Sequence, residues 1–200
     1  MPIRNFLASI ISASASAALL QWMPGMDISN TFRLSVNVTR LDLTPTVQGM
    51  EVGYNTAGEC LANLVLSNPE EGAIFYETGN TVRITELTNT VGEYIGVGII
   101  GTPGCTATVP SLKTVQVQYE NGTEGVQVAY DDGSGVAGLE HQSCVWMECP
   151  SEDGDFVVLI FKQGGQSTLA GCANVQLLPL CDSSQDAPEG SISTKCLTSL

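Results

Sequence analysis

The sequence of 200 residues predicts an all-β protein, a single compact antiparallel domain that closes as a β-trefoil or a similar barrel. Short stretches alternate apolar and polar residues, and turn residues separate them at intervals of about eight to twelve residues. No window of about eleven residues beyond the N-terminal segment keeps a helical period. About ten to twelve short strands would suit a closed barrel, because closure removes exposed edges. A β-sandwich is the alternative.

The N-terminus has the features of a secretory signal peptide, expected at residues 1–18. Arg4 supplies a positive charge, Phe6 to Ile11 is mostly apolar, and Ser12 to Ala18 offers Ala-x-Ala cleavage patterns. The apolar part is too short for a membrane span, which needs roughly 20 apolar residues. We therefore expect a secreted, extracellular protein that has no membrane partner.

Three stretches give the clearest strand signals. Phe32 to Val38 alternates apolar and polar residues, as a half-buried strand does. Val115 to Tyr130 alternates on both sides of Asn121 to Gly125, which predicts a hairpin with a five-residue loop. Phe156 to Phe161 is an unbroken apolar run, which predicts a strand buried on both faces. Weaker strands are expected at 50–55, 62–66, 73–76, 81–87, 94–100, 105–109, 144–149 and 172–178.

The domain is expected to span residues 30–181, and residues 182–200 are expected to form a flexible C-terminal tail. Pro179 is expected to end the last strand, and the segment 182–194 is polar with Ile192 as its only large apolar residue. Cys196 could tie this tail to Cys181 through a short loop.

The formal net charge of −14 makes nucleic acid an unsuitable partner, because binding phosphates requires a basic face. Seven cysteines in an exported chain predict a disulfide framework with one cysteine left over. Cys144 and Cys149 are five residues apart in one strand, so they point to opposite faces and should not bond to each other. No metal site is expected, because the sequence has no Cys-x-x-Cys pair and only one histidine, His141.

No catalytic residue and no cofactor is predicted. A serine hydrolase needs a histidine and an oriented nucleophile, but His141 is more simply a loop histidine beside Glu140, and no Gly-x-Ser-x-Gly motif is present. The acidic turns at 131–132 and 152–155 lack the spacing of a calcium-binding EF-hand loop. A glycoside hydrolase needs only two facing carboxylates, and with twenty-one acidic residues the sequence neither supports nor excludes one.

Two acceptor sequences predict N-linked glycosylation, at Asn37 and at Asn121. Asn37 is expected on the polar side of its strand, and Asn121 in the loop of the predicted hairpin.

Several short motifs together resemble a family of small secreted proteins of filamentous ascomycete fungi that has no assigned function. The motifs are FRLSVNV at 32–38, YNTAG at 54–58, WMEC at 146–149, LIF at 159–161 and CANVQLLPL at 172–180, so the resemblance covers roughly residues 30–181. It implies secretion and a disulfide between Cys149 and Cys172, and it supplies no catalytic residue.

The sequence departs from the family pattern in four places, with extra cysteines at Cys60, Cys105 and Cys144 and with Asn55 where a histidine is more usual. A second bond, between Cys60 and Cys105, is expected beside the implied one.

Three classes of function remain. The first is a non-catalytic secreted protein, effector-like or a surface-binding or carbohydrate-binding module, whose extracellular ligand could be a carbohydrate or a host protein. The second is an extracellular glycoside hydrolase that uses paired carboxylates, and the third is a protease inhibitor. Because exposed loops on a rigid scaffold usually hold the binding residues, we expect the ligand at Asp131 to Gly135 and at Gly101 to Cys105.

Overall fold

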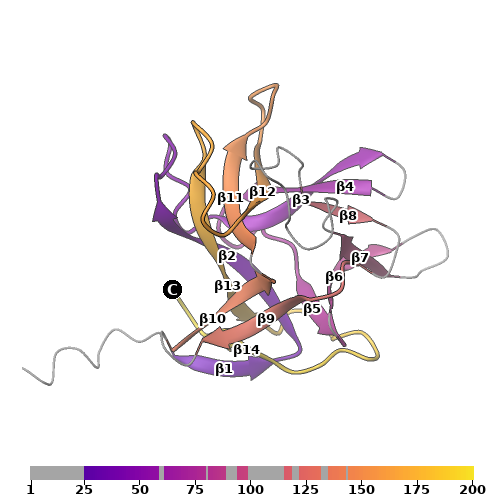
Figure 1. The fold of residues 1–200 in the computed structure, drawn as a ribbon. Helices are drawn as coiled ribbons and strands as arrows, with labels where there is room; N and C mark the ends of the chain where they lie inside the picture. Colours follow the sequence, from indigo (N-terminus) through magenta and orange to yellow (C-terminus); the bar gives the residue numbers. More distant parts are fainter. Residues whose placement is uncertain are drawn as a thin grey trace, which may run out of the picture.

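A computed structural model describes residues 25–58, 61–79, 81–88, 94–98, 115–118, 122–131, 135–142 and 144–200, and the described residues form strands and turns without a helix (Figure 1). Among them, nothing has the helical length and apolar character needed to cross a bilayer. The expected signal peptide lies outside the described residues.

Six strands close into a barrel, which confirms the predicted fold class. The closing contact is the antiparallel pairing of β2 with β13, which runs from Thr31↔Asp182 to Arg40↔Asn174. Around the barrel the order is β2, β3, β4, β12, β11 and β13, and the strands come from two stretches of chain, 31–67 and 144–182. Their bounds are β2 Thr31–Arg40, β3 Glu51–Gly58, β4 Leu61–Ser67, β11 Cys144–Pro150, β12 Val157–Gln163 and β13 Ala173–Asp182.

The other strands extend this sheet or pack beside it. Four of them connect β2 to β4 by a second route, namely β5 (Phe75–Thr78), β6 (Thr81–Thr88), β7 (Tyr94–Gly98) and β8 (Gln116–Gln118). β9 (Val126–Asp131) and β10 (Val136–His141) form a separate two-stranded sheet. β1 (Met26–Ser29) pairs antiparallel with β14 (Thr194–Leu197), which also makes a parallel contact with β13.

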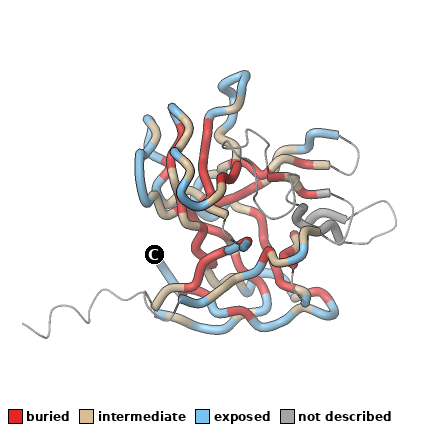
Figure 2. Tube along the Cα trace, in the orientation of Figure 1, coloured by how far each residue is buried: buried red, intermediate tan, exposed pale blue. Residues whose placement is uncertain are grey.

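The main core fills the barrel with one face of each strand. In β2, Phe32, Leu34 and Val36 are buried, as their alternation predicts. In β12, Leu159 and Phe161 belong to this core. Figure 2 shows the buried strands in red, and the exposed segments gather at the loops and strand ends.

β12 is buried on both faces, as predicted from its apolar run, but it starts later than expected. Ile160, on the opposite face from Leu159, packs in a second small cluster with Met147. Phe156 precedes the strand and is 46% exposed, so the prediction that the buried strand begins there is wrong. The apolar run itself does not show which residue begins the strand, because pairing with β11 determines that residue.

The described residues between Val115 and Tyr130 do not form the predicted hairpin. β8 pairs with β4 and β7, whereas β9 pairs with β10. Val117 and Val126 are both fully buried, as the alternation predicted, whereas Tyr130, also predicted to face inward, is 40% exposed. The alternation could not indicate the partner strand, because that is decided by non-local contacts.

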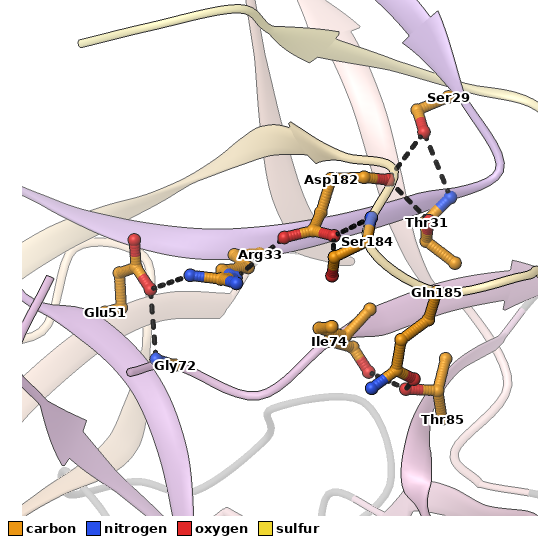
Figure 3. Close-up of polar contacts among 10 residues, drawn as sticks. All are labelled: Ser29, Thr31, Arg33, Glu51, Gly72, Ile74, Thr85, Asp182, Ser184 and Gln185. Atoms are coloured by element: carbon orange, nitrogen blue, oxygen red, sulfur yellow. Dashed lines mark hydrogen bonds and ion pairs between the residues drawn. The ribbon is translucent and has the colours of Figure 1, made fainter. Parts of the chain in front are cut away.

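The C-terminal segment differs from the expected flexible tail. It contains β14, in which Cys196 and Leu197 are almost fully buried, and it is held by the Cys181–Cys196 disulfide with an S–S distance of 2.01 Å. The Gln185 and Thr85 side chains also form a hydrogen bond of 2.8 Å (Figure 3). The polar composition of the whole segment concealed a short strand fixed by its pairing with β1.

A partly buried charge cluster joins three barrel strands. Arg33 in β2 lies between Glu51 in β3, at 3.7 Å, and Asp182 at the end of β13, at 2.8 Å (Figure 3). Glu51 also accepts a hydrogen bond of 3.0 Å from the backbone amide of Gly72. Burial opposes ionisation of Asp182, but hydrogen bonds from Ser184 and the charge of Arg33 lower its pKa overall. The cluster therefore places one positive charge between two negative charges of the barrel wall.

Candidate functional site: a pocket at the mouth of the barrel

One end of the barrel opens into a pocket surrounded by three segments of chain. Three segments meet there, namely the β2–β3 loop, the β11–β12 turn and the last part of the β12–β13 connection. The second and third lie together because β11 runs antiparallel to both β12 and β13. These segments lie together at the top of Figure 1. The pocket has a volume of about 770 Å³, within the range of roughly 300–1,000 Å³ that is usual for small-molecule sites. We call it the mouth pocket, and its lining residues are 41–47, 50, 66, 150, 154–157 and 168–172.

The inner part of the mouth pocket is apolar and continuous with the core. Val47 is 2% exposed, and Leu43, Met50, Leu66 and Val157 are partly buried against the main core. These residues come from three parts of the chain, namely the β2–β3 loop, the end of β4 and the start of β12. A ligand would therefore contact a rigid apolar surface.

The outer part of the pocket presents two large exposed apolar side chains. Leu41 is 56% exposed and Phe156 is 46% exposed, and both line the pocket. Leu41 has a φ of 60°, a left-handed conformation that is uncommon for a leucine. Exposed apolar side chains beside an open pocket are a feature of binding sites.

Asp42 organises the β2–β3 loop. Its Oδ1 accepts hydrogen bonds from the amides of Leu43, at 2.8 Å, and Val47, at 3.1 Å, and its Oδ2 accepts one from the Thr46 hydroxyl. The loop also contains a cis peptide bond between Thr44 and Pro45. The hydrogen bonds from Thr46, Val47 and Leu43 lower the pKa of the Asp42 carboxyl, so it remains ionised. A charged and hydrogen-bonded Asp42 keeps the loop in one conformation.

The β11–β12 turn positions Phe156 and Asp155. The amide of Ser151 donates to the carbonyl of Phe156 at 2.7 Å, and the amide of Gly154 donates to the carbonyl of Ser151 at 2.9 Å. Gly154 has a φ of 76°, which favours glycine at this position. The turn is therefore hydrogen-bonded internally, and it holds Phe156 against the pocket.

The Cys149–Cys172 disulfide fixes the third segment. It has an S–S distance of 2.03 Å and joins the end of β11 to the residue before β13, the pairing that the family resemblance implied. Both sulfur-bearing residues pack in the second cluster with Ile160 and partly buried Leu169. Because Leu169 and Cys172 also line the mouth pocket, this bond holds one wall of the pocket in place.

An unpaired carboxyl lies in the barrel near this end. Glu148 is fully buried in β11, opposite Leu159 and Ala173, and neither of its oxygens has a hydrogen-bond partner. It shares a strand face with Pro150, which lines the pocket two residues later. Burial raises the pKa of Glu148 well above its usual range, so the neutral acid is favoured.

The structure separates the residues that the sequence singled out. Asn37 is half-buried in β2, opposite Gln176. His141 is 3% exposed and paired in β10, so the prediction of a loop histidine is wrong, because β10 extends as far as this residue. Asp131 ends β9, and its carbonyl accepts a hydrogen bond from the amide of Gly135 at 2.8 Å. None of these residues lines the mouth pocket.

Other predicted positions lie outside the described residues, namely Asn121, residues 132–134, the loop 101–105, and the cysteines Cys60 and Cys105. Cys144 is also disulfide-bonded, and its partner is not among the described cysteines. A bond from Cys144 to Cys60 or Cys105 would exclude the expected Cys60–Cys105 pair. Among the described residues no cluster of His, Cys, Asp and Glu suited to a metal ion occurs.

The extent of the fold agrees with a comparison to known families. A family model described as a domain of unknown function, DUF7907, matches residues 29–181. The chain belongs to this family. The match includes all six barrel strands except the last residue of β13, and it includes every residue that lines the mouth pocket. No curated protein and no solved structure matches the chain.

Sequence reasoning missed the mouth pocket of this DUF7907 protein. The sequence of the β2–β3 loop does contain one indication of an apolar site. The apolar residues Leu41, Leu43 and Val47 stand there among the turn-forming and polar residues of the segment 41–49. Phe156 directly after an acidic turn is a second such indication. Neither indicates a pocket without the barrel closure that brings these loops together.

Proposed function

We propose that this protein is a secreted, non-catalytic binding protein that holds a small ligand with an apolar body in the mouth pocket. The observation that supports this function is the pocket itself, about 770 Å³ with an apolar inner surface. Ligands bind preferentially in concave, mostly apolar sites, and the mouths of β-barrels are common locations for them.

Two of the acidic groups near the pocket, Asp42 and Glu148, are poorly suited to hydrolysis. A glycoside hydrolase requires one carboxyl that donates a proton and a second that acts as base or nucleophile. Asp42 has a lowered pKa, and its carboxylate is occupied by loop hydrogen bonds, which suits it poorly to donate a proton. Glu148 has a raised pKa but is 0% exposed, so a substrate in the pocket does not reach it.

The proposal can be tested with the neutral apolar fluorophore N-phenyl-1-naphthylamine, whose emission increases in an apolar site. We expect saturable binding, and we expect Leu41→Asn and Phe156→Ser each to weaken it by about five-fold. Covering roughly half of a large apolar side chain contributes about 1 kcal/mol, and 1.4 kcal/mol corresponds to a tenfold change in affinity. Asn tolerates the left-handed conformation of residue 41, so the loop should keep its form.

Ile28→Ser is the matched control, because Ile28 is 65% exposed in β1 and does not line the mouth pocket. Its affinity for the fluorophore should equal that of the unmodified protein. Absence of saturable binding, or equal weakening by Ile28→Ser, would contradict the proposed site.

A carbohydrate is the second candidate ligand, and the exposure of Phe156 favours it. An aromatic ring that is 46% exposed beside polar groups can pack against the apolar face of a sugar ring. A glycan array in which binding disappears with Phe156→Ser would support this candidate, and an array without any signal would count against it. The protease-inhibitor alternative depended on the loop 101–105, which lies outside the described residues.

Secretion is part of the proposal, supported by the pattern of residues 1–18 and by the two disulfides among the described residues. N-terminal sequencing of exported protein should begin near Ala18, and material that begins at Met1 would contradict this. N-linked glycosylation remains proposed at Asn37 and Asn121. Peptide mass analysis with and without an N-glycosidase tests both positions.

A further inference from the structure

We propose that the ligand of the mouth pocket is an amphiphile with a positively charged head, such as a protonated amine on an apolar body. This inference rests on the proposed function and specifies the chemical class of its ligand. The apolar body would lie against the inner surface formed by Leu43, Met50 and Leu66, and the cationic head would lie at the rim beside Asp42 and Asp155.

The charges of the described pocket lining all have one sign. Asp42 and Asp155 are the only charged residues among the described lining residues, and they come from the β2–β3 loop and the β11–β12 turn. Both are exposed. A ligand that enters between these two segments passes two carboxylates, and the part of the lining that the structure describes offers no cationic side chain.

Asp42 supplies a permanent negative charge. The Thr46 hydroxyl and the Val47 and Leu43 amides hold its pKa below the usual range, so it stays ionised in neutral and mildly acidic solution. A carboxylate has about four acceptor positions, and these three hydrogen bonds leave room for one further donor. An ammonium group provides such donors together with the opposite charge.

Two described cations, Lys162 and Arg40, lie outside the pocket lining. Lys162 donates its ammonium hydrogens to the carbonyl of Gln166, at 2.9 Å, and to the hydroxyl of Thr168, at 3.0 Å. The formal net charge of the chain is −14, so its long-range field also attracts cations and repels anions.

The test uses three ligands that share one apolar body, namely 2-naphthylmethylamine, 2-naphthylmethanol and 2-naphthoate. Affinities are measured by displacement of N-phenyl-1-naphthylamine at pH 7 and low salt. We expect the amine to bind about three- to tenfold more tightly than the alcohol, the size expected for an exposed ion pair or two. The carboxylate should bind more weakly than the alcohol, and added salt should reduce both differences.

Asp155→Asn should reduce the preference for the amine over the alcohol, because Asp42 alone then remains at the rim, and it should leave the affinity of the alcohol unchanged. Asp153→Asn is the matched control, because Asp153 is an exposed acid of the same turn that does not line the pocket. Asp155 is chosen over Asp42 because Asp42 also holds its loop. Thermal unfolding of both variants should match the unmodified protein.

Equal affinities for the amine, the alcohol and the carboxylate would overturn this inference and leave the proposed pocket standing. A preference for the amine that persists unchanged in Asp155→Asn and in high salt would also overturn it. If none of the three ligands and no fluorophore binds, both the inference and the proposed function fail.

Discussion

Glu148 has unfavourable surroundings. It follows Trp146 by two residues in β11 and so points to the same face, into the barrel interior, where both of its oxygens lack hydrogen-bond partners. A buried polar group without a partner costs about 1–3 kcal/mol of stability. Retaining such a group weakens the barrel next to the mouth pocket.

Replacing Glu148 with an apolar residue of similar size should stabilise the protein. Burial raises the pKa of Glu148 in the folded state, so folding favours the protonated acid. The stability that this acid contributes is complete below the unfolded pKa, near 4.3, and is lost as the pH rises towards the folded pKa. Glu148→Met should therefore gain about 1–3 kcal/mol in free energy of unfolding at pH 7, and less at pH 4.5.

Urea unfolding at the two pH values measures this gain, with exposed Glu152→Gln as the control. A Glu148→Met protein whose stability relative to the unmodified protein is the same at pH 4.5 and pH 7 would show that Glu148 does not titrate as its burial requires.

At the scale of elements, the β12–β13 connection depends on one disulfide. The connection returns from the far end of β12 to the mouth, because β12 and β13 both run antiparallel to β11. Cys149–Cys172 fixes its end, and Leu169 packs beside that bond. The backbone pairing of Trp146 with Val175 and of Glu148 with Ala173 remains without the disulfide.

Removal of this bond by Cys149→Ala with Cys172→Ala should loosen the pocket wall while the barrel stays folded. We expect a loss of about 2–5 kcal/mol in free energy of unfolding. Amide hydrogen exchange should become faster in residues 164–172, and binding of N-phenyl-1-naphthylamine should weaken. Unchanged exchange in this connection would mean that packing alone holds it.

At the scale of the whole molecule, the C-terminal segment closes the end opposite the mouth pocket. Cys181 lies at the far end of β13 from the pocket, and the Cys181–Cys196 bond brings β14 beside it. Thr194 donates a hydrogen bond of 2.5 Å to Glu77, so the segment also contacts β5. The residues beyond the end of the family match at 181 therefore complete the core.

The double variant Cys181→Ala with Cys196→Ala should lose about 3 kcal/mol of stability, as expected for a disulfide that closes a loop of about 15 residues. It should retain fluorophore binding at the mouth pocket, in contrast to the Cys149 and Cys172 variant. Limited proteolysis should cut within residues 183–200 faster in this variant than in the unmodified protein. Equal cleavage rates would support the flexible tail that the sequence predicted.

The sequence by itself determined the all-β class, the inward face of β2 and the doubly buried part of β12. Alternation and apolar runs are local, and they report which side chains leave water. They contain no information on strand partners, which is why β8 and β9 were expected to pair with each other. Only the tertiary structure joined β9 to β10.

The tertiary structure also decided where the candidate site lies. Leu41, Phe156 and Leu169 are far apart in the chain and have no shared motif, and they meet because β2 pairs with β13 and closes the barrel. In the same way, β14 forms within a segment of polar composition because Cys196 bonds to Cys181 and residues 194–197 pair with β1. A pocket made by loops from three connections is a property of closure, and closure depends on contacts between distant residues.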